Sequence, residues 1–196
     1  MNFLAHIYLS GNNDLLKIGN FMAYGIRGND YLDYPEWIQK GIILHREIDT
    51  FKDSHPIFRQ SKQRIQQKYN HYSGVIIDLY YDHFLAKNWS NYSATPLAEY
   101  VNHFYELLKQ NKSLLSPRTL KIYPVMIEHN WLLDYASFEG ISKILMQMDY
   151  RTKMKSNMSE APKELWADYD LFENEYTSFF EELILYCDKK KAELNN

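Results

Sequence analysis

The chain has 196 residues, of which 45% are hydrophobic and 24% charged, and its formal net charge at pH 7 is −3. This length favours one domain around one core, and the charge predicts no general attraction to nucleic acid. Its single cysteine, Cys187, excludes an internal disulfide, and its apolar neighbours predict that it is buried. Because the N-terminus lacks a basic region and no run of about eighteen apolar residues occurs, we expect no secretory signal, no membrane span and a cytoplasmic location.

Helices are expected throughout. The chain contains only seven glycines and six prolines, and its apolar residues recur mostly at steps of three and four. The first apolar run, from Phe3 to Leu9, fits a strand or a helix, and helix is favoured because no other segment offers a strand to pair with it. Gly19-Asn20, Gly25 and Gly28-Asn29 predict turns near the ends of the segment that they enclose.

The later helices follow from apolar stripes and from proline positions. They are expected from Trp37 to the break at Ser54-His55-Pro56, from there to about Lys68, from Tyr72 to Asn88, from Pro96 past Leu108, from Pro117 towards Asp134 with a kink at Pro124, over 137–150, and from Pro162 through Tyr186. The prediction is a single all-α helical bundle domain over residues 1–196.

Two of these helices carry histidine and aspartate together. His45 and Asp49 are four residues apart, and so are Asp78 and Asp82, with His83 next in the chain. Residues at this spacing share one helix face, and two such faces turned towards each other would form a metal site. The alternatives are that His45 and Asp49 form a hydrogen-bonded pair at a helix edge, and that Asp78 is exposed at the surface. Burial of several carboxylates favours metal, because it is costly unless they are paired, protonated or metal-bound.

The absence of several known sequence motifs narrows the enzyme classes to which the chain could belong. The chain has no Walker A, dinucleotide-binding, zincin or nucleophile-elbow motif, which disfavours those enzyme classes. Arg59, Lys62, Arg64 and Lys68 share one predicted helix. They form either a solvated face or a local docking patch for an acidic partner.

Four groups of residues resemble the acyl carrier protein phosphodiesterase family, also called ACP hydrolase. They occur in order over roughly the first ninety residues: Asn2-Phe3-Leu4-Ala5-His6; Gly19-Asn20-Phe21 with Arg27-Gly28; Gly41-Ile42-x-Leu44-His45-Arg46-x-Ile48-Asp49-x-Phe51-x-Asp53-x-His55-Pro56; and Asp82-His83-Phe84-Leu85-Ala86 with Trp89.

The resemblance implies a fold related to the HD-domain phosphohydrolases and hydrolysis of the phosphodiester between 4′-phosphopantetheine and a serine of holo-acyl carrier protein. It also implies a divalent metal, with Mn²⁺ favoured and Mg²⁺ or Fe²⁺ as alternatives. A metal neutralises the anionic diester and lowers the pKa of a bound water. The oligomeric state is left open.

On this resemblance we expect His45, Asp49, Asp82 and His83 to bind the metal or to support its ligands directly. His6 is a further catalytic candidate, and Arg46 or Arg27 is expected to clamp the phosphate by bidentate hydrogen bonds.

One position departs from the family pattern. Where the pattern reads Gly-Asn-x-x-Ala-Asp, this chain has Tyr24 in place of the aspartate. A neutral phenol is a poor substitute for a carboxylate at neutral pH. The alternatives are therefore a catalytically impaired homologue that binds carrier protein, or an HD-type phosphohydrolase of a small phosphate ester.

Overall fold

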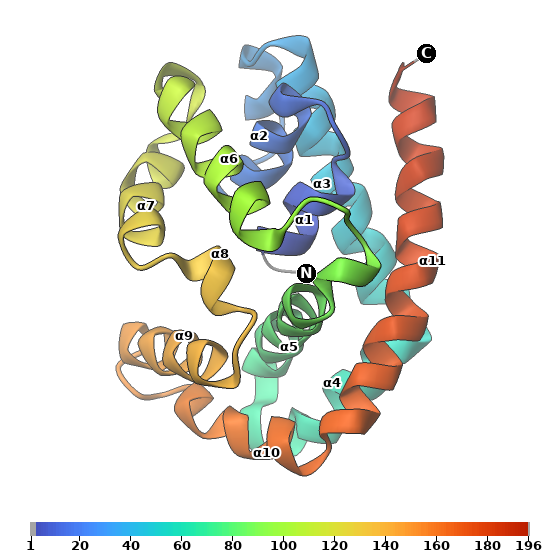
Figure 1. Ribbon diagram of the computed structural model, residues 1–196, viewed down its shortest axis with the longest axis vertical. Coiled ribbons are helices and arrows are strands. Elements are labelled where there is room, and N and C mark those ends of the chain that lie inside the picture. The colour runs from blue at the N-terminus through green and yellow to red at the C-terminus, as the bar shows by residue number, and fades with distance from the viewer. Residues whose placement is uncertain (1–2, 196) are drawn as a thin grey trace.

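The computed structural model describes residues 3–195 and is all-α, with no strand in that range, which confirms the predicted fold class (Figure 1). Asn2, which opens the N-terminal motif, lies outside the described residues. The α-helices are α1 (Phe3–Leu9), α2 (Asp14–Met22), α3 (Glu36–Ser54), α4 (Pro56–Tyr69), α5 (Ser73–Lys87), α6 (Leu97–Gln110), α7 (Pro117–Glu128), α8 (Trp131–Asp134), α9 (Phe138–Arg151), α10 (Ala161–Ala167) and α11 (Tyr169–Asn195). Short 3₁₀ turns join several of them, including η1 (Ala23–Gly25) and η2 (Asp30–Asp33).

The glycines of α2 and α3 are packing residues. A Cβ on Gly19 would lie 2.2 Å from the carbonyl oxygen of Ile38, and one on Gly41 would lie 2.3 Å from that of Leu16. The two helices therefore cross at backbone contact, which only glycine permits. This corrects the turn predicted at Gly19-Asn20, because close helix packing rather than chain reversal selects glycine there.

Helix α5 is deeply buried. Eleven of its fifteen residues are buried, so it has no solvated face. Figure 1 shows α5 in the middle of the molecule, with α11 running along one side past α3 and α4. Because α5 is enclosed, its polar side chains must find partners inside the protein.

The long C-terminal helix supplies much of the aromatic core. Phe172, Tyr176, Phe179 and Leu183 are fully buried, as the apolar stripe predicts, and Cys187 is buried beside them. Tyr186 is only half-buried, and its hydroxyl donates to Glu47 Oε2 at 2.6 Å. The buried stripe therefore continues from Leu183 to Cys187, and not to Tyr186 as predicted.

The predicted helix from Pro117 to Asp134 is two helices. Pro124 lies inside α7, and the chain breaks after it, at Asn130, whose φ is +48°. Asparagine tolerates this left-handed conformation better than other non-glycine residues. The break leaves Trp131 and Tyr135 beside α9, where they line the pocket described below.

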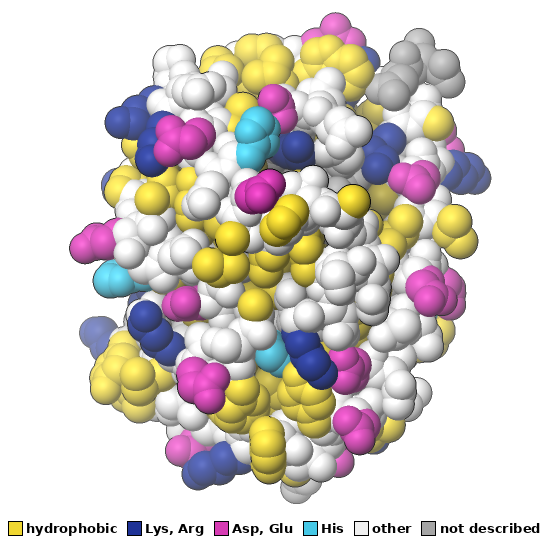
Figure 2. All heavy atoms as spheres, in the orientation of Figure 1, with side chains coloured by type: hydrophobic (Ala, Val, Ile, Leu, Met, Phe, Trp, Pro, Cys, Tyr) yellow, Lys and Arg dark blue, Asp and Glu magenta, His cyan; other side chains and the backbone are white. Residues whose placement is uncertain are grey.

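The surface carries charges of both signs. Figure 2 shows acidic and basic side chains interspersed over one face of the molecule. Within residues 3–195, no helix combines the length and the apolar character needed to cross a membrane.

Candidate functional site

The predicted pair on α3 is present. His45 Nε2 lies 3.3 Å from Asp49 Oδ2, across one turn of the helix. Asp49 retains 40% of its side-chain exposure, whereas the His45 side chain is 13% exposed. The pair therefore stands at an opening to solvent, not in the closed core.

Helix α1 adds a second histidine to this pair. His6 Nε2 lies 3.8 Å from Asp49 Oδ1, and the rings of His6 and His45 stack with centroids 4.0 Å apart. One ligand atom from each of the three residues lies within 4.8 Å of the others. Over residues 3–195 this is the one group of three or more potential ligands that is so compact.

Asn20 on α2 fixes the protonation of both rings. Its side-chain nitrogen donates to His6 O and Ser10 Oγ, so its Oδ1 must be the acceptor 2.8 Å from His6 Nδ1. His45 Nδ1 lies 2.8 Å from the carbonyl oxygen of Asn20 and therefore also donates. When neutral, both imidazoles carry their proton on Nδ1 and present an unprotonated Nε2.

This arrangement suits a cation. Two nitrogen lone pairs face the carboxylate oxygens of Asp49, and His6 Nε2 is buried with no hydrogen-bond partner. Lone pairs facing one another repel unless a proton or a metal ion lies between them. Second hydrogen bonds through Nδ1, as Asn20 provides here, orient histidines that bind metals. His6, His45 and Asp49 therefore form a donor set that fits a divalent transition metal.

The electrostatics also favour an ionised Asp49 beside a neutral His6. Burial by itself would raise the pKa of Asp49, but its contact with the His45 ring and the charge of Lys52 hold that pKa well below its usual range. Burial, and then the neighbouring His45, lower the pKa of His6 well below that of a free histidine. Both side chains thus favour the forms that bind a metal.

Lys52 is a site residue that sequence patterns did not indicate. Its ammonium nitrogen lies 3.2 Å from Asp78 Oδ2, 3.3 Å from Asp49 Oδ1 and 3.6 Å from Asp53 Oδ1. Burial alone would lower the pKa of Lys52, but Asp78, Asp49 and Asp53 together raise it above the usual range. Its spacing of three from Asp49 was the available signal, because residues three apart on a helix are neighbours.

Asp82 does not belong to this compact group and instead binds the backbone of α1. Its two carboxylate oxygens accept hydrogen bonds from the backbone N–H groups of Leu4, at 2.8 Å, and Ala5, at 3.3 Å. These are free N–H groups in the first turn of α1, so Asp82 caps that helix from α5. Burial raises the pKa of Asp82 to about 7, against the effect of the two N–H donors.

His83 uses both ring nitrogens in packing. Nδ1 donates to the carbonyl oxygen of Tyr135, and Nε2 accepts from the Tyr169 hydroxyl, each at 2.7 Å. Neither nitrogen is left for a metal. Of the predicted set, the structure brings His45 and Asp49 together, whereas Asp82 and His83 on the enclosed helix α5 form hydrogen bonds with other parts of the fold.

The predicted phosphate clamps lie near the cluster in sequence and are differently engaged. Arg46 donates to the carbonyl oxygen of Gly28 at 2.7 Å, and its guanidinium lies 5.0 Å from the ring centroid of Tyr31. Arg27 is exposed in the loop before η2. Arg46 therefore connects α3 to the segment 23–34, and no contact is found between either arginine and the described residues of the cluster.

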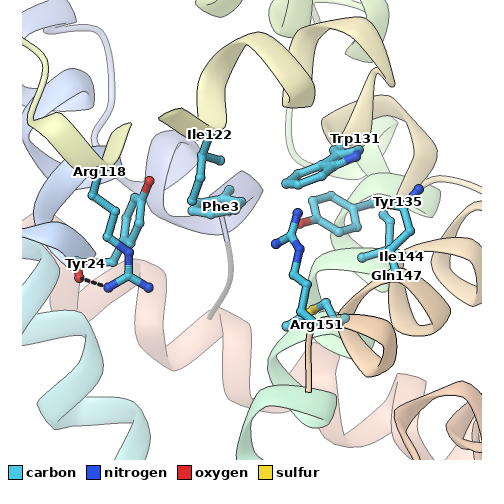
Figure 3. A pocket seen from close by; sticks show the side chains of 10 residues that line it. Phe3, Tyr24, Arg118, Ile122, Trp131, Tyr135, Ile144, Gln147 and Arg151 are labelled. Carbon is cyan, nitrogen blue, oxygen red and sulfur yellow. Dashed lines mark hydrogen bonds between the residues drawn. The ribbon is translucent and has the colours of Figure 1, made fainter. Parts of the chain in front are cut away.

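Tyr24 contributes to an aromatic pocket. Its ring packs edge-on against Phe3, with centroids 5.5 Å apart, and carries the guanidinium of Arg118 4.8 Å from its centre. The pocket has a volume of about 160 Å³. Figure 3 shows Tyr24 and Arg118 on one side of it and Trp131, Tyr135 and Arg151 on the other.

Two of the four basic residues of α4 form ion pairs with α10 and α11. Arg64 forms an ion pair with Glu175 at 2.7 Å, Lys68 forms one with Glu164 at 2.6 Å, and Arg59 donates to the carbonyl oxygen of Asp53. These contacts favour the solvated-face interpretation over a docking patch.

Comparisons with known proteins identify the family of the chain. The profile of the acyl carrier protein phosphodiesterase family matches residues 1–183. The chain belongs to this family. Relatives named acyl carrier protein phosphodiesterase include proteins from Pectobacterium atrosepticum (29% identical, covering 92% of this chain and 94% of the relative), Enterobacter sp. (27%, covering 97% and 100%) and Escherichia coli (27%, covering 97% and 99%). No solved structure matches the chain significantly.

Proposed function

We propose that this family member is a metal-dependent phosphodiesterase that releases 4′-phosphopantetheine from holo-acyl carrier protein. The observation that carries the proposal is the convergence of two unprotonated Nε2 atoms on Asp49, with His6 Nε2 buried and unpartnered. The names of the relatives supply the substrate.

His6, His45 and Asp49 would hold the ion, and Asn20 would keep both rings in the required tautomer. A divalent cation at this position supplies charge neutralisation for the diester and acidifies a coordinated water. The chain itself contributes orientation, because each ring is fixed by stacking and by its Nδ1 hydrogen bond. Mn²⁺ as the physiological ion, the HD-domain relationship and the cytoplasmic location stay predictions.

The aromatic pocket is the proposed receptor for the pantetheine arm. Phe3 precedes His6 by three residues on α1, so one wall of the pocket begins about one helical turn from the cluster. Phe3, Ile122, Trp131 and Ile144 offer an apolar lining for the methyl-bearing part of the arm. Over the described residues, Arg118 and Arg151 form no ion pair and stack on Tyr24 and Trp131. Arg118 Nη1 donates to the carbonyl oxygen of Tyr24 at 3.2 Å, and the remaining N–H groups can donate to amide carbonyls of the arm.

The direct experiment is incubation of holo-carrier protein with the purified protein and Mn²⁺, Mg²⁺ or Fe²⁺, followed by intact-mass spectrometry. The proposal expects loss of the phosphopantetheine mass, and none with EDTA. No mass loss under any of the three ions would reject it. Equal turnover of a generic diester, such as bis(p-nitrophenyl) phosphate, would instead indicate a phosphohydrolase of small esters.

Removal of the pocket's cations tests the proposed binding of the arm. Arg118→Ala and Arg151→Ala should each raise KM for holo-carrier protein about fivefold with little change in kcat, since they bind a part of the substrate distant from the reacting bond. Steady-state kinetics checks this, with Lys143→Ala, an exposed cation elsewhere on α9, as the control. A fall in kcat at unchanged KM would contradict this role for the pocket.

Tyr24 supports a second candidate, a carrier-protein-binding homologue without turnover. The phenol packs against Phe3 and Arg118 where the family pattern has a carboxylate, and burial raises its pKa, so it cannot replace an ionised ligand. Binding of holo-carrier protein without mass loss would select this candidate, and recovery of turnover in Tyr24→Asp would explain it.

A further inference from the structure

A lysine ammonium lies at the edge of the proposed metal cluster, surrounded by carboxylates. Lys52 is 7% exposed, and its nitrogen contacts Asp49, Asp53 and Asp78. Its ammonium also lies 5.3 Å from the ring centroid of Phe58, on the opposite helix α4. Such contacts to anions and to a π face hold a cation in place.

The ammonium and a metal would share one oxygen. Asp49 Oδ1 is 3.3 Å from Lys52 Nζ, and the same oxygen is 3.8 Å from the unpartnered His6 Nε2. An ion bound by His6 Nε2 and Asp49 Oδ1 would stand a few ångströms from the ammonium. Two positive charges so close repel each other.

Lys52 also forms an ion pair with a carboxylate on the neighbouring helix α5. Asp78 Oδ2 lies 3.2 Å from Lys52 Nζ, and the Asp78 side chain is 16% exposed. Asp78 is the aspartate that α5 directs towards α3, and its contact with Lys52 takes the place of a contact with a metal. The lysine therefore satisfies the anionic side of the site without an added ion.

We propose that Lys52 is a built-in competitor of the metal: its ammonium occupies the cation position between Asp49 and Asp78 and sets a low affinity for divalent ions. This inference rests on the proposed metal-dependent function. Metal binding then requires the ammonium to withdraw from Asp49 Oδ1 towards Asp53 and Asp78. Activity should respond to the supply of metal over a higher concentration range than a site without the lysine would need.

The test is a direct metal titration of the full chain by isothermal calorimetry with Mn²⁺, using Lys52→Met and Lys52→Gln. Both variants keep a long side chain and remove the charge. We expect each to bind Mn²⁺ at least about tenfold more tightly than the wild type, because the like-charge repulsion is gone. In EDTA both should melt at a lower temperature than the wild type, since three carboxylates lose their counter-charge, and Mn²⁺ should raise their Tm more than it raises that of the wild type.

Lys17→Met is the matched control. Lys17 is also 7% exposed, and it pairs with an aspartate three residues away, Asp14, at 3.5 Å. This variant should leave the affinity for Mn²⁺ unchanged. Equal or weaker Mn²⁺ binding by both Lys52 variants would overturn the inference, and so would an absence of Mn²⁺ binding in every protein. Turnover of holo-carrier protein is measured separately, so either result is distinguishable from failure of the proposed function.

Discussion

The two histidine–aspartate segments carry the same side chains into different surroundings. On α3, His45 and Asp49 face α1 and α2, and Asp49 remains 40% exposed. On α5, Asp82 and His83 are 0% and 2% exposed. The first pair leaves Nε2 lone pairs directed at a carboxylate, whereas in the second segment each described polar atom has a partner within the fold.

This difference shows that the hydrogen-bond partners of histidine and aspartate, more than the residue types, decide whether these side chains are structural or can bind a ligand. A buried carboxylate or imidazole with its hydrogen bonds satisfied is a structural element. A group that is fixed in place but left with an unpaired lone pair can bind a ligand. The contrast makes separate predictions for the two segments.

The largest effect is expected from removal of the α3 pair. His45→Gln and Asp49→Asn should each reduce release of phosphopantetheine by about 100-fold or more, because loss of a ligand should exceed the 10–100-fold cost of losing a residue that only orients one. The measurement is the mass-spectrometric assay at saturating Mn²⁺, with circular dichroism to confirm that the protein remains helical.

His83→Gln is the counterpart on α5. It should keep turnover within a few-fold and lower the free energy of unfolding by about 1–2 kcal/mol, since Tyr135 and Tyr169 lose hydrogen bonds. If His83→Gln instead abolished turnover at unchanged stability, the proposed separation of the two segments would be wrong.

Asp82→Ala should be the most destabilising change on α5. The substitution leaves the N–H groups of Leu4 and Ala5 without their acceptor inside the protein. The free energy of unfolding should fall by about 2–3 kcal/mol, as expected for a lost cap with buried donors. Urea denaturation measures the loss. A change below about 0.5 kcal/mol would show that water or another group replaces the cap.

The smallest effect concerns pH. The pKa of Asp82 is about 7 in the folded protein and 3.8 when unperturbed, so folding favours the neutral carboxyl. Its contribution to stability is complete below about pH 4 and is lost as the pH rises to about 7. Asn resembles the neutral carboxyl and cannot ionise, so the variant keeps the same stability at higher pH. Asp82→Asn should therefore be more costly at pH 4.5 than at pH 7.5.

Denaturation curves for the wild type and Asp82→Asn at both pH values test the direction of this pH dependence. A larger cost at pH 7.5 would mean that the cap works as an ionised carboxylate, with the helix N-terminus overcoming the effect of burial.

Most of the fold could be predicted because helix boundaries depend on local signals. Pro56 and Pro117 begin helices as expected, since proline suits a first turn. The errors at Gly19 and Asn130 have non-local causes: one glycine is required by a neighbouring backbone, and one break depends on how α7 and α8 pack.

The site could be predicted only in part. The contact of His45 with Asp49 follows from helical spacing and is confirmed. The family resemblance indicated His6, but its place against Asp49 depends on the packing of α1 on α2 and α3. The orienting role of Asn20 and the ammonium of Lys52 are tertiary contacts, which one sequence does not reveal.

Helix α1 has a practical consequence for handling the protein. It has seven residues, too few to be stable alone, and it depends on Asp82 and on its neighbours for its shape. Because it delivers His6, any added mass in front of Phe3 would be attached within about one helical turn of the cluster. A purification tag therefore belongs after α11, whose end lies away from the start of α1 in Figure 1, and assays of an N-terminally tagged protein should be repeated after the tag is removed.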